Sequence, residues 1–283
     1  MFRTLSGKEV AATLTENLKT RADALKAKGI EPRLDILRVG ANDSDLAYER
    51  GALKRAEKVG VNVVVHQLSE DISQAEMEAE IQSLNENKDV HGVLMFRPLP
   101  KSLDEKKLAN MLDPNKDVDS MTDASITGVF TDDQKGFPPC TAEAAVAILK
   151  HYDIPLEGKK LVVIGRSLVI GKPVAMLLLK ENATLTICHS RTKKEDMEKY
   201  CKDADIIVAA VGHANTVNRN HMRDGQCIID VGINFNEEGK MVGDVNFDDA
   251  SEFDLSITPV PGGVGAVTST LLMKHLIEGA EKL

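Results

Sequence analysis

The chain has 283 residues, enough for one large domain or two modest ones, with 42% hydrophobic and 28% charged residues, as in ordinary globular proteins. Its formal net charge of −9 argues against a nucleic-acid-binding surface as its main function. No apolar run has the length of a signal peptide or a membrane span, so we expect a cytoplasmic protein that binds neither nucleic acid nor membrane. The four scattered cysteines are expected to be buried, and no metal site is predicted.

Apolar segments of strand type alternate with segments of helical periodicity along the chain. Strands are expected at 34–39, 61–66, 91–96, 160–165, 183–188, 205–211, 226–232 and 255–260. Helices are expected at 7–28, 44–59, 73–87, 104–111, 141–150, 171–181, 195–202 and 266–281. Several of the strands are continuously apolar, as parallel strands covered on both faces are. The alternation therefore predicts an α/β fold with right-handed crossovers.

One stretch, residues 119–141, interrupts the alternation. It is rich in Gly, Pro, Asp and Thr, and it separates three βα-like units from a second series that opens with a helix and the segment 160–165. We interpret it as the seam between two domains. The pattern alone leaves open whether the last helix packs on the second domain or returns to the first.

The segment 160–180, KLVVIGRSLVIGKPVAMLLLK, has the features of a phosphate-binding loop. A strand ends at Gly165 and a helix begins near Gly171, with Pro173 in its first turn, where a missing N–H costs nothing. Such a turn aims free backbone N–H groups at an anion. Because the spacing is GxSxxxG rather than GxGxxG, a glycine-punctuated loop without a ligand is an equally good interpretation of this motif alone.

The following strand favours a nucleotide with a 2′-phosphate. A domain that prefers NAD usually has an acidic residue at the tip of its second strand, but here the tip reads HSRTKK. Ser190 and Arg191, with Arg166 in the preceding loop, offer a hydroxyl and guanidinium donors, which suit a phosphate dianion. NADP is therefore the predicted cofactor. Gly212 and Ile233, which follow two later strands, are expected near its nicotinamide ring.

The motifs that follow are more specific. KDVDS, PCT, GRSLVIGKP, CHSRT, DVGIN, GDV and TPVPGGVGAVT occur in this order, after a helix that carries Tyr48 eight residues beyond Gly40. On these motifs the chain, over essentially its whole length, resembles the bifunctional methylenetetrahydrofolate dehydrogenase/methenyltetrahydrofolate cyclohydrolase family.

The resemblance implies a fold of two domains with the folate between them. An N-terminal α/β catalytic domain would comprise residues 1–140 and 266–283, with the C-terminal helix returning to it, and a Rossmann-type NADP-binding domain would comprise 141–265. It also implies a homodimer whose small-molecule substrate is a tetrahydrofolate derivative.

The site residues that the resemblance implies are these. Tyr48 would stack on the pterin and Asp119 would hold its polar edge, as the catalytic residues. The other substrate contacts would be Phe96, Pro261, Gly262 and Gly263. The cofactor contacts would be Gly165, Arg166, Ser167, Ser190, Arg191, Gly212 and Ile233.

The chain departs from the family pattern at the catalytic helix. Aligned without gaps from Gly40 to Gly60, it has Ala52 where the family has the lysine of Tyr-x-x-x-Lys. Lys54 is displaced by about 200° around the helix, and Arg55 carries a guanidinium, which is a poor proton shuttle. Phe96 replaces the glutamine that partners the lysine, and Ser120 replaces a glycine.

These departures bear on one of the two activities. Hydride transfer from 5,10-methylenetetrahydrofolate needs the rings to be positioned and no side-chain proton transfer. The cyclohydrolase step needs a general acid/base, which alanine cannot supply. We therefore expect an NADP-dependent dehydrogenase with cyclohydrolase activity lost or strongly reduced. The alternatives are a fully bifunctional enzyme that makes 10-formyltetrahydrofolate, a non-catalytic folate- or NADP-binding regulator, and a dehydrogenase for another small substrate.

Overall fold

The computed structural model describes residues 1–133 and 135–282, which belong to two compact units. The six-stranded unit comprises Met1–Ala12 and Thr141–Thr268. The three-stranded unit comprises the described residues of Thr13–Cys140 and Ser269–Leu283.

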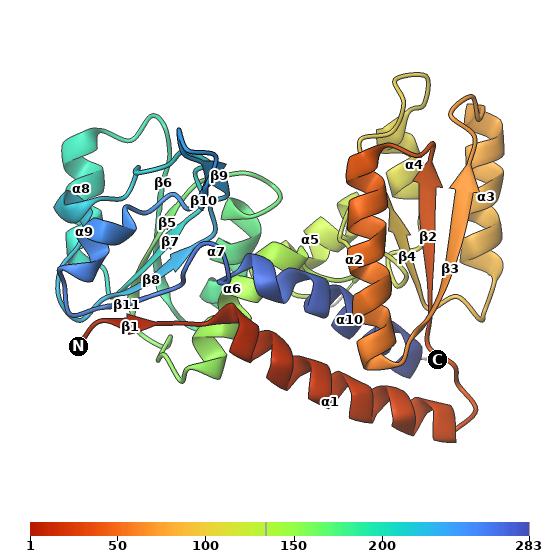
Figure 1. Ribbon diagram of the computed structural model, residues 1–283, viewed down its shortest axis with the longest axis horizontal. Helices are drawn as coiled ribbons and strands as arrows, with labels where there is room; N and C mark the ends of the chain where they lie inside the picture. The colour runs from red at the N-terminus through yellow and green to blue at the C-terminus, as the bar shows by residue number, and fades with distance from the viewer. Residues whose placement is uncertain (134, 283) are drawn as a thin grey trace. The chain divides into compact units, whose positions relative to one another are not determined.

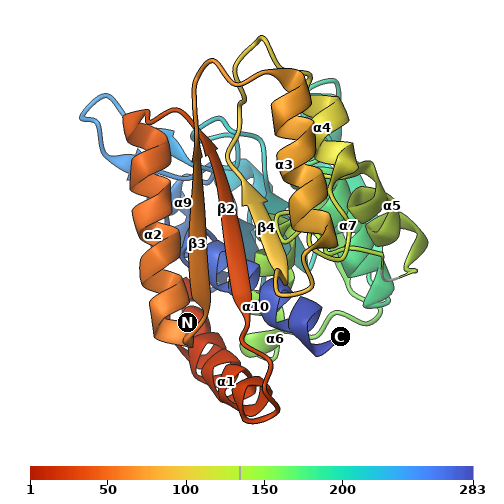
Figure 2. The same ribbon diagram turned by 90° about the vertical axis from the view of Figure 1, so that its right-hand side faces the viewer.

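The three-stranded unit is built on one parallel sheet. Its strands are β2 (Arg33–Val39), β3 (Asn62–Leu68) and β4 (Gly92–Met95), which lie side by side in the order β3-β2-β4 (Figure 2). Its helices are α2 (Asp43–Val59), α3 (Gln74–Glu86), α4 (Glu105–Met111) and α5 (Asp123–Thr131), with most of α1 (Gly7–Ala27) and α10 (Gly265–Glu281). The central strand β2 is buried along its interior, where Leu37 joins a core with Met77 and Ile81 of α3.

The six-stranded unit has the doubly wound architecture. Its parallel strands follow the order β1 (Arg3–Thr4), β11 (Ser256–Ile257), β8 (Cys227–Asp230), β7 (Ile206–Ala209), β5 (Lys160–Ile164) and β6 (Thr184–Cys188) (Figure 1). The other elements are α6 (Cys140–His151), α7 (Gly171–Lys180), α8 (Lys194–Asp203), α9 (Phe247–Ser251), a 3-10 turn η1 (Arg219–His221) and the hairpin β9 (Asn234–Phe235) with β10 (Met241–Val242). The chain reverses its direction of sheet growth at β5, and ligands of such sheets bind where this reversal occurs.

The expected α/β fold is confirmed. Each of the eight expected strands and each of the eight expected helices corresponds to an observed element. The strand expected at 255–260 is shorter, Ser256–Ile257, because Pro259 and Pro261 cannot donate backbone hydrogen bonds. The segment 119–141, expected only as a seam, contains α5. That helix begins because the Thr122 side chain caps it by accepting from the Ser125 N–H.

The unit boundary near residue 140 coincides with the expected seam, but the first twelve residues differ from expectation. They group with the six-stranded unit because β1 pairs with β11. From Ser269 onward the last helix groups with the three-stranded unit, in keeping with the implied return to the first domain.

Two further observations concern residues 1–133 and 135–282 alone. No helix among them is long and apolar enough to cross a bilayer. The four cysteines are buried thiols that form no disulfide, as expected of small apolar side chains, and burial raises the pKa of Cys201 and of Cys227 to about 12.

Candidate active site

Helix α2 presents the predicted tyrosine. The helix begins after Asn42, whose side chain accepts from the Asp45 N–H at 2.9 Å, and ends at Gly60, whose left-handed conformation terminates it. Its buried face consists of Ala52, Ala56 and Val59.

The side chains of Tyr48 and Phe96 are in contact. Tyr48 is 50% exposed, whereas Phe96, just after β4, is 5% exposed. Their ring centroids are 5.3 Å apart with an interplanar angle of 60°, an edge-on arrangement that aromatic rings favour. Phe96 thus supports the Tyr48 ring, half of which stays exposed.

The position to which the resemblance assigns a lysine is apolar in this chain. Ala52 is 7% exposed. Lys54 is exposed, as its expected place on another side of the helix implies, and the Arg55 guanidinium lies 3.4 Å from the Thr15 hydroxyl. Burial lowers the pKa of Arg55, but a guanidinium stays protonated at neutral pH. Neither Lys54 nor Arg55 belongs to the buried face that contains Ala52.

Asp119 lies beside a basic residue that the sequence interpretation missed. Residues 117–119 run next to β4 because Asp117 bridges Val93, and this brings Asp119 to Arg97, with 3.8 Å between carboxylate and guanidinium. Burial raises the pKa of Asp119 to about 6, and the positive charge of Arg97 opposes that rise. Burial, with the charge of Asp119, also raises the pKa of Tyr48, which stays neutral.

The loop that carries Asp119 is held by a buried carboxylate. Asp117, fully buried, accepts from the N–H groups of Met121 and Thr122 and from the Ser125 hydroxyl. Ser120 has a φ of +56°, in the left-handed region that suits the glycine implied there by the resemblance. Its hydroxyl is buried and has no hydrogen-bond partner among the described residues.

A second group missed from the sequence lies behind this loop. The His275 ring, fully buried on α10, stacks on Phe137 with centroids 4.8 Å apart. Its Nδ1 is 2.8 Å from the Val118 carbonyl oxygen, and since a carbonyl only accepts, Nδ1 carries the proton. Cys140 Sγ lies 3.7 Å from the same nitrogen. No sequence motif signals this packing, because its members are up to 157 residues apart.

The predicted substrate residues 261–263 belong to the six-stranded unit. Gly262 has a φ of +101° and its carbonyl accepts from the Gly7 N–H at 2.9 Å. A Cβ on Gly7 would lie 1.9 Å from the Gly263 carbonyl oxygen. The close approach of these two backbones accounts for the glycines, and Pro261 is left exposed.

The glycine loop after β5 fits a dinucleotide phosphate. A Cβ on Gly171 would lie 2.4 Å from the Gly165 carbonyl oxygen, so only glycine permits this approach of helix to strand. Gly165 itself has a φ of +135°, which a side chain would not tolerate. Helix α7 begins without a side-chain cap, and the Ser167 hydroxyl accepts from the Ile170 N–H at 3.1 Å. In the first turn of α7 the Gly171 N–H donates to the Ser167 hydroxyl at 3.5 Å and the Lys172 N–H to the Ser167 carbonyl at 3.0 Å, and Pro173 has no N–H. An anion at this helix start would therefore be held by the loop before it and by the helix dipole.

The two loops predicted to bind the 2′-phosphate, after β5 and after β6, lie side by side. Ile164 is paired with Cys188, and the Gly165 N–H donates to the Cys188 carbonyl, so the loops after β5 and β6 start next to each other. Arg166, Ser190 and Arg191 are all exposed there. The β6 loop is folded back by hydrogen bonds between His189 and Thr192, in both directions. The residues that fit NADP are therefore present and accessible.

Gly212 and Ile233 lie in the loops after β7 and β8. Gly212 has a φ of +76°, and a Cβ there would meet no other atom within 4 Å. Ile233 is 60% exposed. Both positions thus have open space beside them, as a ring-binding position requires.

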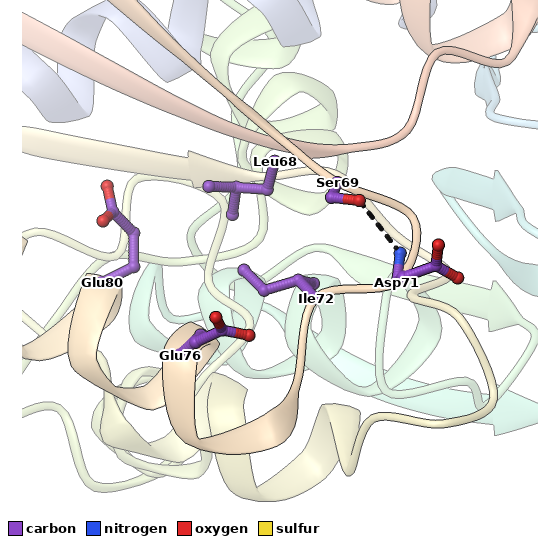
Figure 3. A pocket seen from close by; sticks show the side chains of 6 residues that line it. All are labelled: Leu68, Ser69, Asp71, Ile72, Glu76 and Glu80. Carbon is purple, nitrogen blue, oxygen red and sulfur yellow. Dashed lines mark hydrogen bonds between the residues drawn. The ribbon is translucent and has the colours of Figure 1, made fainter.

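One pocket of the three-stranded unit lies apart from these residues. Figure 3 shows its lining, which consists of Leu68, Ser69, Asp71, Ile72, Glu76 and Glu80. The Asp71 N–H donates to the Ser69 hydroxyl, and Glu80 binds His66 Nδ1 at 2.6 Å. With three carboxylates and no basic residue in its lining, this pocket would repel phosphates and the glutamate of a folate.

Comparison with known families gives two matches in chain order. Residues 5–119 match the catalytic domain of the tetrahydrofolate dehydrogenase/cyclohydrolase family, and residues 139–283 match its NAD(P)-binding domain. Among curated relatives, the bifunctional protein FolD of Carboxydothermus hydrogenoformans is 52% identical over 285 aligned residues, covering 100% of this chain and 99% of that protein. The bifunctional protein FolD of Clostridium botulinum is 46% identical, with 100% and 99% covered.

Solved structures agree in fold over the full length. The bifunctional FolD dehydrogenase/cyclohydrolase of Campylobacter jejuni superposes with a TM-score of 0.92 at 37% identity, covering 100% of this chain and 99% of that one. FolD of Trypanosoma brucei, solved in complex with NADP and an inhibitor, gives a TM-score of 0.87 at 31% identity, with 99% and 97% covered.

Proposed function

Since the chain belongs to the tetrahydrofolate dehydrogenase/cyclohydrolase family, we propose that it is an NADP-dependent methylenetetrahydrofolate dehydrogenase. The observation that carries this proposal is the pair of intact constellations. One is Tyr48 with Asp119, and the other is the glycine loop of Gly165 flanked by Arg166 and Arg191. The NADP found in the related trypanosomal structure supports the choice of cofactor.

In this proposal the protein acts by positioning. NADP supplies the hydride acceptor for the methylene carbon of 5,10-methylenetetrahydrofolate. The free face of Tyr48 packs on the pterin, and Phe96 fixes the tilt of that ring. Asp119, ionised above its pKa of about 6, accepts hydrogen bonds from the N–H groups at the pterin's edge. No protein group transfers a proton in this step.

Two candidates remain for the second activity. The departures at Ala52 and Phe96 favour loss or strong reduction of cyclohydrolase activity, because neither side chain can donate or accept a proton. The relatives named bifunctional, at 46% to 52% identity, favour a fully bifunctional enzyme that makes 10-formyltetrahydrofolate. In the second case another group must move the proton.

A two-wavelength assay tests both parts. Purified protein receives 5,10-methylenetetrahydrofolate and NADP, and the reduced cofactor and the methenyl product are followed together. Equal rises, followed by decay of the methenyl product at its uncatalysed rate, indicate a dehydrogenase without cyclohydrolase activity. Reduced cofactor without accumulating methenyl product indicates a bifunctional enzyme. Binding of both ligands with no reduction would favour a non-catalytic regulator, and failure to bind any tetrahydrofolate would favour another substrate.

The predicted 2′-phosphate contacts have a separate test. We expect Arg191→Ser to raise the KM for NADP roughly tenfold and to leave the KM for NAD nearly unchanged, since one charge-assisted bond to the phosphate is lost. Lys202→Ser, a cation-to-serine change elsewhere in this unit, serves as the control. A parallel loss with both cofactors would contradict the assignment of Arg191.

We also propose that the protein is a homodimer and that the exposed apolar side chains around the hairpin form the interface. Phe235, Met241 and Phe247 are 67%, 38% and 40% exposed on β9, β10 and α9. Exposed apolar side chains gathered in this way are a feature of protein–protein interfaces. Light scattering should give twice the chain mass, falling to the chain mass in Phe235→Asp. A wild-type monomer at micromolar concentration would refute the dimer.

A further inference from the structure

Two buried carboxylates lie beneath the loops that follow β7 and β8. Asp230 is the last residue of β8 and is 3% exposed, and Asp244, two residues after β10, is fully buried. Burial raises the pKa of Asp230 to about 6, although three backbone N–H groups oppose the rise. Charges this deep are costly unless their oxygens are fully hydrogen-bonded.

The hydrogen bonds of Asp230 are all to backbone. Its Oδ1 accepts from the N–H groups of Gly232 at 3.0 Å and Asp244 at 2.9 Å, and its Oδ2 accepts from Val245 at 3.0 Å. Asp230 therefore joins the loop that follows its own strand to the segment 243–245. A Cβ on Gly243 would lie 1.8 Å from Asp230 Oδ2, so the segment 243–245 can come this close to the carboxylate only because residue 243 is glycine.

The hydrogen bonds of Asp244 extend this network to the loop after β7. Its Oδ2 accepts from the N–H groups of Val211 at 2.6 Å and Gly212 at 3.0 Å. Its Oδ1 accepts from Asn234 Nδ2 at 3.0 Å, and the same amide donates to the Gly243 carbonyl at 3.1 Å. The loops after β7 and β8 are thus both attached to one buried segment.

The backbone and side-chain groups that Asp230 and Asp244 bind lie at or beside Gly212 and Ile233, the two residues expected near the nicotinamide. Gly212 donates its own N–H to Asp244, so it can offer a ligand only its carbonyl and the open space beside it. Ile233 lies between Gly232, which is bonded to Asp230, and Asn234, which is bonded to Asp244. All four carboxylate oxygens already accept hydrogen bonds from these loops, and both side chains are buried.

We propose that Asp230 and Asp244 are positioning residues that hold the Gly212 and Ile233 backbones in register to receive the nicotinamide end of NADP. The inference deepens the proposed function, because it rests on the placement of the nicotinamide at these two loops. It predicts that weakening the pair impairs binding of the nicotinamide half selectively. The adenosine half, held by the loops after β5 and β6, is bound as before.

The test uses the full-length enzyme and the change Asp244→Asn. The amide oxygen can still accept from Val211 and Gly212, but its NH₂ group then faces the NH₂ group of Asn234, so one hydrogen bond becomes a repulsion. We expect affinity for NADP to fall roughly tenfold, the magnitude for a mispaired buried polar group. Affinity for adenosine 2′,5′-bisphosphate, which lacks the nicotinamide, should stay within about twofold of wild type.

A second variant separates positioning from simple loss of structure. Asn234→Asp in the Asp244→Asn background restores a donor facing an acceptor, although it removes the hydrogen bond from Asn234 to the Gly243 carbonyl. We expect it to recover part of the lost NADP affinity. Asp248→Asn, an exposed change in the same unit, is the matched control and should bind both probes as wild type does.

The outcomes are distinct. Equal weakening of NADP and of the bisphosphate would mean general disruption of the unit, and unchanged NADP affinity in Asp244→Asn would mean that the loops are held otherwise. Either result overturns the inference. Both probes report binding alone, so a wild-type protein that binds NADP but fails to oxidise methylenetetrahydrofolate would refute the proposed function without touching this test.

Discussion

The guanidinium of Arg97 lies 3.8 Å from the carboxylate of Asp119. The two residues come together because the segment around Asp117 runs parallel to β4. Asp117 and His275 also face Asp119, the first raising its pKa and the second lowering it. Arg97 is thus the group that most opposes the effect of burial on Asp119.

The first prediction concerns the pH profile. A carboxylate with a raised pKa loses its charge as pH falls through about 6, so kcat/KM for the folate should fall on the acid side there. Arg97→Leu removes the opposing positive charge and should move this acid limb upward by about one pH unit. Arg97→Lys keeps the charge and should leave the limb in place. An unmoved limb in Arg97→Leu would show that the pair has no influence on the titrating group.

The second prediction concerns stability. The folded-state pKa of Asp119 lies above its ordinary value of 3.8, so the folded protein binds the extra proton between these pH values. The unfolding free energy contributed by this group therefore falls as pH rises from about 4 to 6. Asp119→Asn, which cannot ionise, should be more stable than wild type at pH 7.5 by about 1 kcal/mol, a figure reduced for solvent screening. The difference should vanish near pH 4.

Urea unfolding at both pH values measures this, with Asp71→Asn, an exposed change in the same unit, as the control. The same Asp119→Asn variant should bind the folate more weakly, because an amide accepts less strongly than a carboxylate. A variant less stable than wild type at pH 7.5 would mean that Asp119 makes a stabilising interaction that outweighs its burial.

The third prediction concerns Gly51, in the middle of α2. A Cβ at this position would meet no atom within 4 Å, and its φ is not in the left-handed region. Gly51→Ala should therefore raise the unfolding free energy by about 1 kcal/mol through helix propensity and a less flexible unfolded chain. Gly60→Ala, at the left-handed C-cap of the same helix, should instead lower it. If Gly60→Ala were also stabilising, the left-handed conformation of Gly60 would not be what favours glycine at the end of the helix.

The sequence predicted the architecture well where local signals were strong. The apolar β-branched runs of β2 and β5 and the glycine spacing of the loop after β5 are such signals. Helix α5 was missed because its short apolar run lies among Gly, Asp and Thr, and the hairpin of β9 and β10 because each strand has two residues. The pairings of Arg97 with Asp119 and of Asp230 with the Val245 N–H were out of reach, since each depends on which loops the sheet brings together.

The last prediction concerns position 52, where the resemblance implies a lysine. In Ala52→Lys the new ammonium would lie at a position that is 7% exposed, where burial lowers the pKa of a lysine toward that of a useful general base. Phe96, 5% exposed and in contact with Tyr48, offers it no hydrogen bond. We therefore expect the single variant to hydrolyse the methenyl product little faster than wild type, and Ala52→Lys with Phe96→Gln to do so roughly a hundredfold faster.

The measurement is the decay of added methenyltetrahydrofolate, corrected for the uncatalysed rate. Ala52→Met, which adds a chain of similar length without a proton to transfer, is the matched control and should not accelerate it. Equal acceleration by the single and double lysine variants would mean that the lysine needs no glutamine to orient it. Rapid decay already in wild type would mean that Ala52 has not cost the enzyme its second activity, and that a group outside this helix face moves the proton.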